Sequence, residues 1–329
     1  MCAIFGILNY KGIVSNKVMN KITQALANAS EERGTDASGI AYVKDGDVKI
    51  YKRPKPAHKL KFKVPEGTKV VMGHTRFATQ GNKKDNFNNH PFRGFAKKGF
   101  ALAHNGVITN DLNLGLQYSL PHTEIVTDSY VAVQLIEHFG ELSNDSLEFV
   151  ANNLRGTFNL TVLDESNNLY LVKGSNPLTI LDFESLGLIV YASTDSILKK
   201  AMAKTILQHF KNEEIGIHEG EIFKFDSNAK LTSSRYEVKE YFSPKYYDYD
   251  WFDYPNQTSE DAPLDDFLFS YARMFGYEDY EIEELLEYGY TADEIEDLLY
   301  DEEEMKYVLS YIRGIEYDKR TSRIDYEQY

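Results

Sequence analysis

Apolar residues recur at strand or helix spacing along the first 240 residues. Residues 2–8 form an almost wholly apolar run, which is typical of a buried strand. Residues 15–30 repeat apolar positions at helical spacing, and Ser15 is suited to open that helix. Further helices are predicted at 127–139 and 195–203, and strands at 39–43, 48–51, 70–73, 100–104, 158–163, 169–173, 179–182 and 188–193. Many strands without regular alternation with helices predict an α+β layered fold.

The end of the chain follows a different pattern. Apolar residues at helical spacing predict short helices within 264–275, 282–286, 295–299 and 305–312. Gly276 and Gly289 are suited to end two of them. Thr291 and Glu294 fit a capping box before the third. Residues 241–263 are rich in Tyr, Asp and Pro, and predict a connecting segment.

Charge changes at the same boundary. The chain has a formal net charge of −15, yet residues 241–329 hold 25 of the 51 acidic residues, 7 of the 36 basic residues and 16 of the 24 tyrosines. We therefore expect a globular domain over 2–240 and an acidic, tyrosine-rich helical tail over 264–329. An acidic tail disfavours nucleic acid as its direct partner.

Several classes of protein are disfavoured by simple features. No apolar run approaches the roughly 20 residues needed to span a bilayer, so we expect no membrane association. The N-terminus lacks the basic region of a signal peptide. A single cysteine excludes an intramolecular disulfide framework and a thiolate-rich metal site. A cytoplasmic location is the resulting expectation.

Cys2 is that single cysteine, directly after Met1. Methionine aminopeptidases remove Met1 when the second residue is small, which would leave a thiol and an α-amine on one residue. An α-amine has an unperturbed pKa of about 7.7–8.0 and can accept a proton near neutral pH. A thiol is a strong nucleophile once ionised. Taken alone, Cys2 is equally well a small apolar residue that begins a strand.

Five motifs change this balance: RGTDASG (33–39), GHTRFATQG (73–81), NNHPF (88–92), AHNGVITN (103–110) and VTDS (126–129). In this order and spacing, residues 2–240 resemble the class II glutamine amidotransferases of the N-terminal nucleophile (Ntn) hydrolase superfamily. Glucosamine-phosphate synthase and amidophosphoribosyltransferase contain such glutaminase domains. The resemblance implies a four-layer αββα sandwich, and hydrolysis of glutamine to glutamate and ammonia through a Cys2 thioester.

The motif residues suit the functional groups of glutamine. Arg76 could grip the α-carboxylate and Asp128 could pair with the α-ammonium. Asn105 could supply a side-chain N–H, and Gly106 a backbone N–H, to a tetrahedral oxyanion. The resemblance assigns the same roles and adds a contact from Thr79. The alternatives are a structural ion pair for Arg76 and, for Asp128, the N-cap of the helix predicted at 127–139.

Other motif residues have structural interpretations. We interpret residues 33–39 as a turn that supports the active site from below. His74, His90 and His104 are expected to be structural, with a supporting role near the pocket left open for His90. No carboxylate joins them at ligand spacing, so we predict no metal and no cofactor.

Two positions depart from the pattern. Gln80 stands where synthase relatives often carry histidine, and Phe77 where they often carry tryptophan. These differences bear on closure of the loop that covers glutamine and on transfer of ammonia.

No acceptor domain that would consume the ammonia is evident in residues 241–329. They contain no Gly-Gly pair, and the acids Asp265 and Asp266 open a predicted helix, where the helix dipole favours them. We expect a glutaminase that hands ammonia to a separate synthase, which docks on the acidic tail. The alternatives are an Ntn-type hydrolase of another amide and a non-catalytic glutamine sensor. The tail could instead be a helical cap on its own domain.

Overall fold

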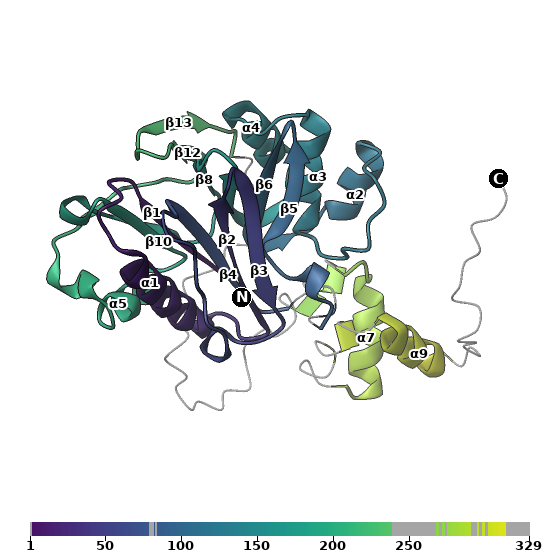
Figure 1. Cartoon of the computed structure of the whole chain (residues 1–329). Helices are drawn as coiled ribbons and strands as arrows, with labels where there is room; N and C mark the ends of the chain where they lie inside the picture. The colour runs from purple at the N-terminus through teal and green to yellow at the C-terminus, as the bar shows by residue number, and fades with distance from the viewer. Residues whose placement is uncertain are drawn as a thin grey trace. The chain divides into compact units, whose positions relative to one another are not determined.

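Figure 1 shows the computed structural model of the chain. It describes residues 2–78, 82, 84–238, 268–269, 272–273, 275–290, 295, 298–299 and 302–313. The chain divides into two compact units, Met1–Pro244 and Lys245–Tyr329. Each unit is described by itself.

The first sheet of the larger unit has seven antiparallel strands in the order β11-β9-β10-β1-β4-β2-β3. Strand β1 lies inside this sheet, and all of its residues are buried. Its neighbours are β4 and β10. The strands are β1 (Ala3–Asn9), β2 (Ala37–Lys44), β3 (Asp47–Arg53), β4 (Val70–Arg76), β9 (Thr179–Phe183), β10 (Leu188–Ala192) and β11 (Glu213–Glu214).

The second sheet has six strands in the order β13-β12-β8-β7-β6-β5. Strand β6 is paired with β5 only as far as the Phe92–Leu102 pair, while its pairing with β7 continues to Ile108. One edge of β6 is therefore left without a strand over its second half. The strands are β5 (Phe92–Ala96), β6 (Lys98–Ile108), β7 (Gly156–Asp164), β8 (Leu169–Lys173), β12 (Glu221–Phe225) and β13 (Leu231–Arg235).

Helices cover the outer face of each sheet (Figure 1). Helices α1 (Asn16–Ala29) and α5 (Asp195–Met202) pack on the first sheet. Helices α3 (Tyr130–Phe139) and α4 (Asn144–Asn153), with the short α2 (Asp111–Gln117), pack on the second. Single 3-10 turns lie at Ser30–Glu32, Ala57–Lys59, Asn86–Asn88, Glu184–Leu186 and Ile206–His209.

A third apolar cluster fills the space between the sheets, with Ile4 and Met72 from one side and Leu163 and Leu171 from the other. Within it, the Tyr191 hydroxyl lies 2.7 Å from that of Thr161, which joins β10 to β7 across the layers. The predicted α+β fold is therefore confirmed, with helix, sheet, sheet and helix layers in that order.

Some boundaries differ from those predicted. Ser15 occupies the N-cap position of α1, but its side chain makes no capping hydrogen bond. The helix predicted to include 127–129 begins at Tyr130. Strands β5, β11, β12 and β13 and helices α2 and α4 were not predicted. Helix α4 has a capping box formed by Ser143 and Ser146, and a serine in the second position is a weaker signal than glutamate.

The smaller unit has its own apolar core. Ile282 and Leu285 of α7 (Asp279–Tyr288) pack with Met305 and Leu309 of α9 (Glu302–Ile312). Gly289 ends α7 with a φ of +109°, as predicted. The connecting segment 241–263, the acids Asp265 and Asp266, and the capping box of Thr291 and Glu294 lie outside the described residues. Among the described residues, none of the helices is long and apolar enough to cross a membrane.

Candidate active site

Four of the six predicted site residues line one cavity, namely Cys2, Arg76, Gly106 and Asp128. Cys2 directly precedes β1, and the pairing of Ala3 with Thr75 places it beside Arg76, the last residue of β4. Gly106 comes from β6 of the other sheet. They share a small cavity of about 10 Å³, which is room for roughly one water molecule. It is lined by Cys2, Arg76, Phe77, His90, His104, Gly106, Thr127, Asp128 and Ser129.

The Cys2 thiol is half-buried and donates a hydrogen bond to the carbonyl of Phe77 over 3.4 Å. Burial raises the pKa of the Cys2 thiol, and the Phe77 carbonyl and nearby positive charge only partly oppose this. The resting thiol is therefore protonated near neutral pH. It needs a base before it can act as a nucleophile.

Residues 33–39 support the site, as interpreted from the sequence. Arg33 Nε donates to the Cys2 carbonyl over 2.8 Å. The Asp36 backbone N–H donates to the Arg76 carbonyl over 2.9 Å, and the Asp36 carboxylate accepts from Ala78 N–H over 2.9 Å. This turn thus fixes both Cys2 and the end of β4.

Arg76 is buried, and its Nη1 donates to Asn89 Oδ1 over 2.8 Å. Lys52 supports this partner by donating to the Asn89 carbonyl and, over 3.3 Å, to the Phe87 carbonyl. Burial lowers the pKa of Lys52 to about 8. The guanidinium is therefore held at the cavity by a neutral amide.

Asp128 is buried and joins β6 to the start of α3. One of its oxygens accepts from Ile108 N–H over 2.7 Å. The other accepts from the backbone N–H of Ser129 over 2.7 Å and from its hydroxyl over 3.0 Å. The alternative in which Asp128 is the N-cap is wrong, because Ser129 is the N-cap residue of α3.

Asn105 and Gly106 differ in their relation to the cavity. Gly106 lines it, but Asn105 is not among the lining residues. Asn105 Nδ2 donates over 3.3 Å to the hydroxyl of Ser193, which lies just beyond β10. Thr79 and Gln80 lie outside the described residues, so the predicted contact of Thr79 stays a prediction.

The chain is similar to known proteins in sequence and in fold. No protein-family model matches the chain. It is 32% identical over 236 residues to the isomerizing glutamine–fructose-6-phosphate aminotransferase of Staphylococcus epidermidis, across 69% of this chain and 36% of that protein. It is 30% identical over 210 residues to the 7-cyano-7-deazaguanine synthase of Sulfolobus acidocaldarius, across 59% of this chain and 43% of that protein.

A solved structure shares the fold. The glutamine phosphoribosylpyrophosphate amidotransferase of B. subtilis matches with a TM-score of 0.55 at 20% identity, over 72% of this chain and 50% of that one. The larger unit belongs to the class II, Ntn-type glutamine amidotransferases. The chain matches less than half the length of the two sequence relatives.

Three buried histidines of the amidotransferase unit form one connected group. The rings of His74 and His90 stack with their centroids 4.1 Å apart. His74 Nε2 lies 3.0 Å from the His104 carbonyl, and His104 Nδ1 lies 2.8 Å from the Ser129 hydroxyl. Burial lowers the pKa of His74 to about 3, and it lowers the pKa values of His90 and His104 as well. These rings are neutral at physiological pH.

The sequence predicted structural histidines and left a place near the pocket open for His90 alone. His90 and His104 both line the cavity beside Cys2. Neither ring nitrogen of His90 has a hydrogen-bond partner among the described residues. In the part of the chain that the structure describes, no group of three or more His, Cys, Asp or Glu side chains could hold a metal ion.

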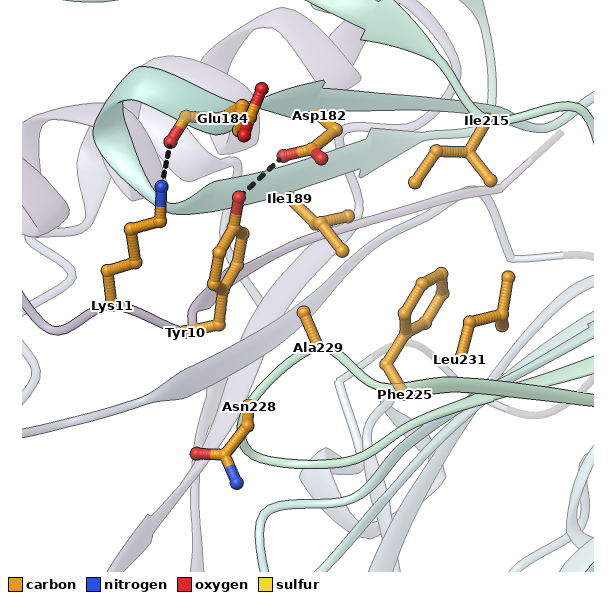
Figure 2. Close-up of a pocket in the computed structure, with 10 residues that line it drawn as sticks. All are labelled: Tyr10, Lys11, Asp182, Glu184, Ile189, Ile215, Phe225, Asn228, Ala229 and Leu231. Atoms are coloured by element: carbon orange, nitrogen blue, oxygen red, sulfur yellow. Dashed lines mark hydrogen bonds between the residues drawn. The ribbon is translucent and has the colours of Figure 1, made fainter.

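A larger hollow of about 330 Å³ lies beyond the far end of β1 (Figure 2). Its polar groups already contact one another: the Tyr10 hydroxyl donates to Asp182 over 3.1 Å, and Lys11 Nζ donates to the Glu184 carbonyl over 2.7 Å. Apolar side chains such as Phe225 form the opposite wall. No nucleophile comparable to Cys2 lines it, so the candidate chemistry belongs to the smaller cavity.

The histidine group predicts a steep loss of stability in acid. Its folded pKa values lie below the unfolded value of about 6.5, so the unfolded chain binds more protons and stability falls as pH drops below 6.5. A buried histidine whose folded pKa lies well below 5, such as His74, lowers the free energy of unfolding by about 2 kcal/mol between pH 7 and pH 5. Between pH 7 and pH 5, His90→Phe should therefore lose about 2 kcal/mol less unfolding free energy than the wild type. The measurement is urea denaturation at both pH values.

The exposed His209 supplies the matched control, His209→Phe, which should keep the acid sensitivity of the wild type. An equal loss of stability from pH 7 to pH 5 in His90→Phe and wild type would contradict the prediction.

Proposed function

We propose that the amidotransferase unit hydrolyses L-glutamine to glutamate and ammonia through a thioester on Cys2. The observation that carries this proposal is the shared cavity of Cys2, Arg76, Asp128 and Gly106, in which a nucleophile, a cation, an anion and a backbone N–H line one space. The sequence relative with 32% identity is named a glutamine–fructose-6-phosphate aminotransferase, which supports glutamine as the substrate.

Removal of Met1 by an aminopeptidase precedes the reaction and occurs once. The freed α-amine of Cys2 takes the proton of its own thiol, and the thiolate attacks the side-chain amide carbon of glutamine. The oxyanion of the tetrahedral intermediate faces the backbone N–H of Gly106. The C–N bond then breaks, the protonated α-amine gives its proton to the leaving nitrogen, and ammonia departs. Water hydrolyses the thioester and releases glutamate and the free thiol.

Recognition of the amino-acid head group is assigned to the two buried charges. Arg76 pairs with the α-carboxylate and Asp128 with the α-ammonium, and Thr79 adds a contact. Glutamine is far larger than the cavity of about 10 Å³, so binding requires movement at its mouth. The Phe77 side chain is 52% exposed and lines the cavity, which makes it a candidate for that movement.

The ammonia is proposed to pass to an acceptor enzyme that docks on the acidic helical unit. Helix α7 presents Glu283 and Glu287 to solvent one turn apart. The apolar face of α7 already packs in the core of its own unit. The groups of α7 that a partner can contact are therefore mainly its exposed carboxylates. A basic surface on the acceptor enzyme would complement it.

Substitution of Cys2 tests the chemistry directly. Cys2→Ala should abolish glutamate release from glutamine, because no other described side chain at the cavity can form the thioester. The measurement is glutamate production by purified protein in which mass spectrometry shows that Met1 is absent. Turnover by Cys2→Ala would contradict the mechanism. Turnover of blocked amides but not glutamine by the wild type would indicate another amide substrate, and glutamine binding without turnover would indicate a sensor.

Substitution of Arg76 tests head-group recognition. Arg76→Ala should raise KM for glutamine on the order of 10–100-fold, because a charge-assisted contact of about 1.5–3 kcal/mol is lost. Arg76→Lys keeps the positive charge but loses the paired guanidinium N–H donors that can bind a carboxylate bidentately. Its KM for glutamine should lie between those of Arg76→Ala and wild type. Arg93→Ala, which removes a surface ion pair with Asp47, is the control and should leave KM unchanged. An unchanged KM in Arg76→Ala with intact folding would remove this role.

Reversal of charge on α7 tests docking. The double variant Glu283→Lys, Glu287→Lys should lose the acceptor enzyme that co-purifies with wild type at low salt, and should keep glutaminase activity. Wild-type association should also weaken as salt rises from about 50 to 500 mM, because exposed charges are screened. The control is the double variant Lys199→Glu, Lys204→Glu, on and just beyond α5 of the amidotransferase unit. Association that is insensitive to both salt and the α7 reversal would exclude this surface.

A further inference from the structure

The loop after β8 reaches the backbone of the active site through one side-chain amide. Asn176 Nδ2 donates to the carbonyl of Asn105 over 2.9 Å. That carbonyl belongs to the same peptide group as the N–H of Gly106. Because a peptide group is planar and trans, its C=O and N–H point in opposite directions. A contact that fixes the Asn105 carbonyl therefore also fixes the direction of the Gly106 N–H.

The register of β6 and β7 shows which way that N–H points. In an antiparallel pair, hydrogen-bonded residue pairs recur at every second position. Asn105 is opposite Asn159, and alternation along the ladder makes this a hydrogen-bonded pair, so we infer that Gly106 turns its N–H away from β7. Two backbone hydrogen bonds at the ends of the ladder show which positions are hydrogen-bonded. Glu165 N–H donates to the Gly99 carbonyl over 3.2 Å, and Thr109 N–H donates to the Arg155 carbonyl over 3.1 Å. Asn105 lies an even number of residues from both Gly99 and Thr109, so it belongs to the same class.

The other side of Gly106 is the edge of β6 that β5 leaves open. Pairing with β5 ends at Phe92 and Leu102, before Gly106 is reached. Gly106 lines the cavity that also contains Cys2. Its N–H is thus directed to the side on which an oxyanion would form.

The residue type at position 106 does not fix the backbone by itself. Gly106 has a φ of +146°, and an added Cβ would lie 1.9 Å from the Thr157 carbonyl oxygen. Only glycine fits, yet glycine restricts its own dihedral angles less than any other residue. The orientation of the Asn105–Gly106 peptide is therefore set by its contacts, which are the pairing of Asn105 with β7 and the side-chain amide of Asn176.

Asn176 is itself fixed by a buried residue of β7. Asn159 is fully buried, and its Nδ2 donates to the carbonyls of Asn176 (2.8 Å) and Pro177 (3.0 Å). Its Oδ1 accepts from the Gly174 N–H over 2.9 Å. One amide thus ties down the loop from 174 to 177, and that loop in turn presents Asn176 to the Asn105 carbonyl.

We propose that Asn176 is a positioning residue for the oxyanion donor: its side-chain amide holds the Asn105–Gly106 peptide so that the Gly106 N–H faces the reacting carbonyl. Asn176 does not line the cavity and touches no reacting atom. The inference rests on the proposed hydrolysis of glutamine. It predicts that loss of the amide weakens binding of the transition state and leaves binding of glutamine intact.

Two variants remove the donor in different ways. Asn176→Asp keeps the shape and loses the N–H, and Asn176→Ala loses the N–H without adding charge. Both should lower kcat for glutamate release on the order of 10–100-fold, a fraction of the loss from removing an oxyanion donor outright. KM for glutamine should change by less than about 2-fold, as expected for an interaction that acts only in the transition state.

A second readout separates positioning from general damage. Alkylation of Cys2 by iodoacetamide forms no oxyanion, so its rate should be equal in wild type and both variants. Asn16→Asp and Asn16→Ala are the matched controls. Asn16 is also half-buried and also donates through Nδ2 to backbone carbonyls, those of Val64 and Pro65 at 2.7 Å each, at the start of α1. Both controls should keep the wild-type kcat.

The outcomes distinguish this role from the proposed function. If wild type turns over glutamine and both Asn176 variants keep its kcat, the positioning role is overturned and the function stands. A loss of kcat accompanied by an equal loss of alkylation or of glutamine affinity, or matched by the Asn16 controls, would show a structural role instead. A wild type without turnover would overturn the function, and this role with it.

Discussion

The burial of β1 on every side is the constraint on which the rest of the larger unit depends. Strands β4 and β10 flank β1, helix α1 packs on one of its faces and the second sheet on the other. A strand in such a position cannot move without opening both apolar layers. Cys2 directly precedes this strand, so a residue near the end of the chain acquires a fixed position. Arg33 adds to this by holding the Cys2 carbonyl.

The same layering places Gly106 at the cavity. Tyr191 and Thr161 join β10 to β7 through the inner core, and β7 sets the register of β6. Gly106 lies on the part of β6 that β5 does not cover, and this open edge gives its N–H access to the cavity. A fully paired strand would have used that N–H in the ladder. The proposed role of Gly106 therefore depends on the early end of β5.

The sequence allowed much of this arrangement to be predicted, because long apolar runs and ordered motifs are local signals. Strand β8 was predicted with its observed bounds, and β1 and α5 to within a residue at each end. The places of His90 and His104 could not be predicted, because a buried histidine and a pocket histidine look alike in sequence. Asn176 was missed for a related reason. Its partner Asn105 is 71 residues away, and nothing near Asn176 marks the pairing.

The neutral histidines bear on which group can take the thiol proton. A Cys–His pair would require a ring whose pKa lies near neutral, within reach of the sulfur. His74 has a pKa of about 3, and burial lowers the pKa values of His90 and His104 also. Such rings are poor proton acceptors at the pH at which a thiol with a raised pKa must react. An α-amine on Cys2 itself needs no partner residue and has an ordinary pKa near 8. The electrostatics of the cavity therefore favour a nucleophile that supplies its own base over one activated by a neighbouring histidine.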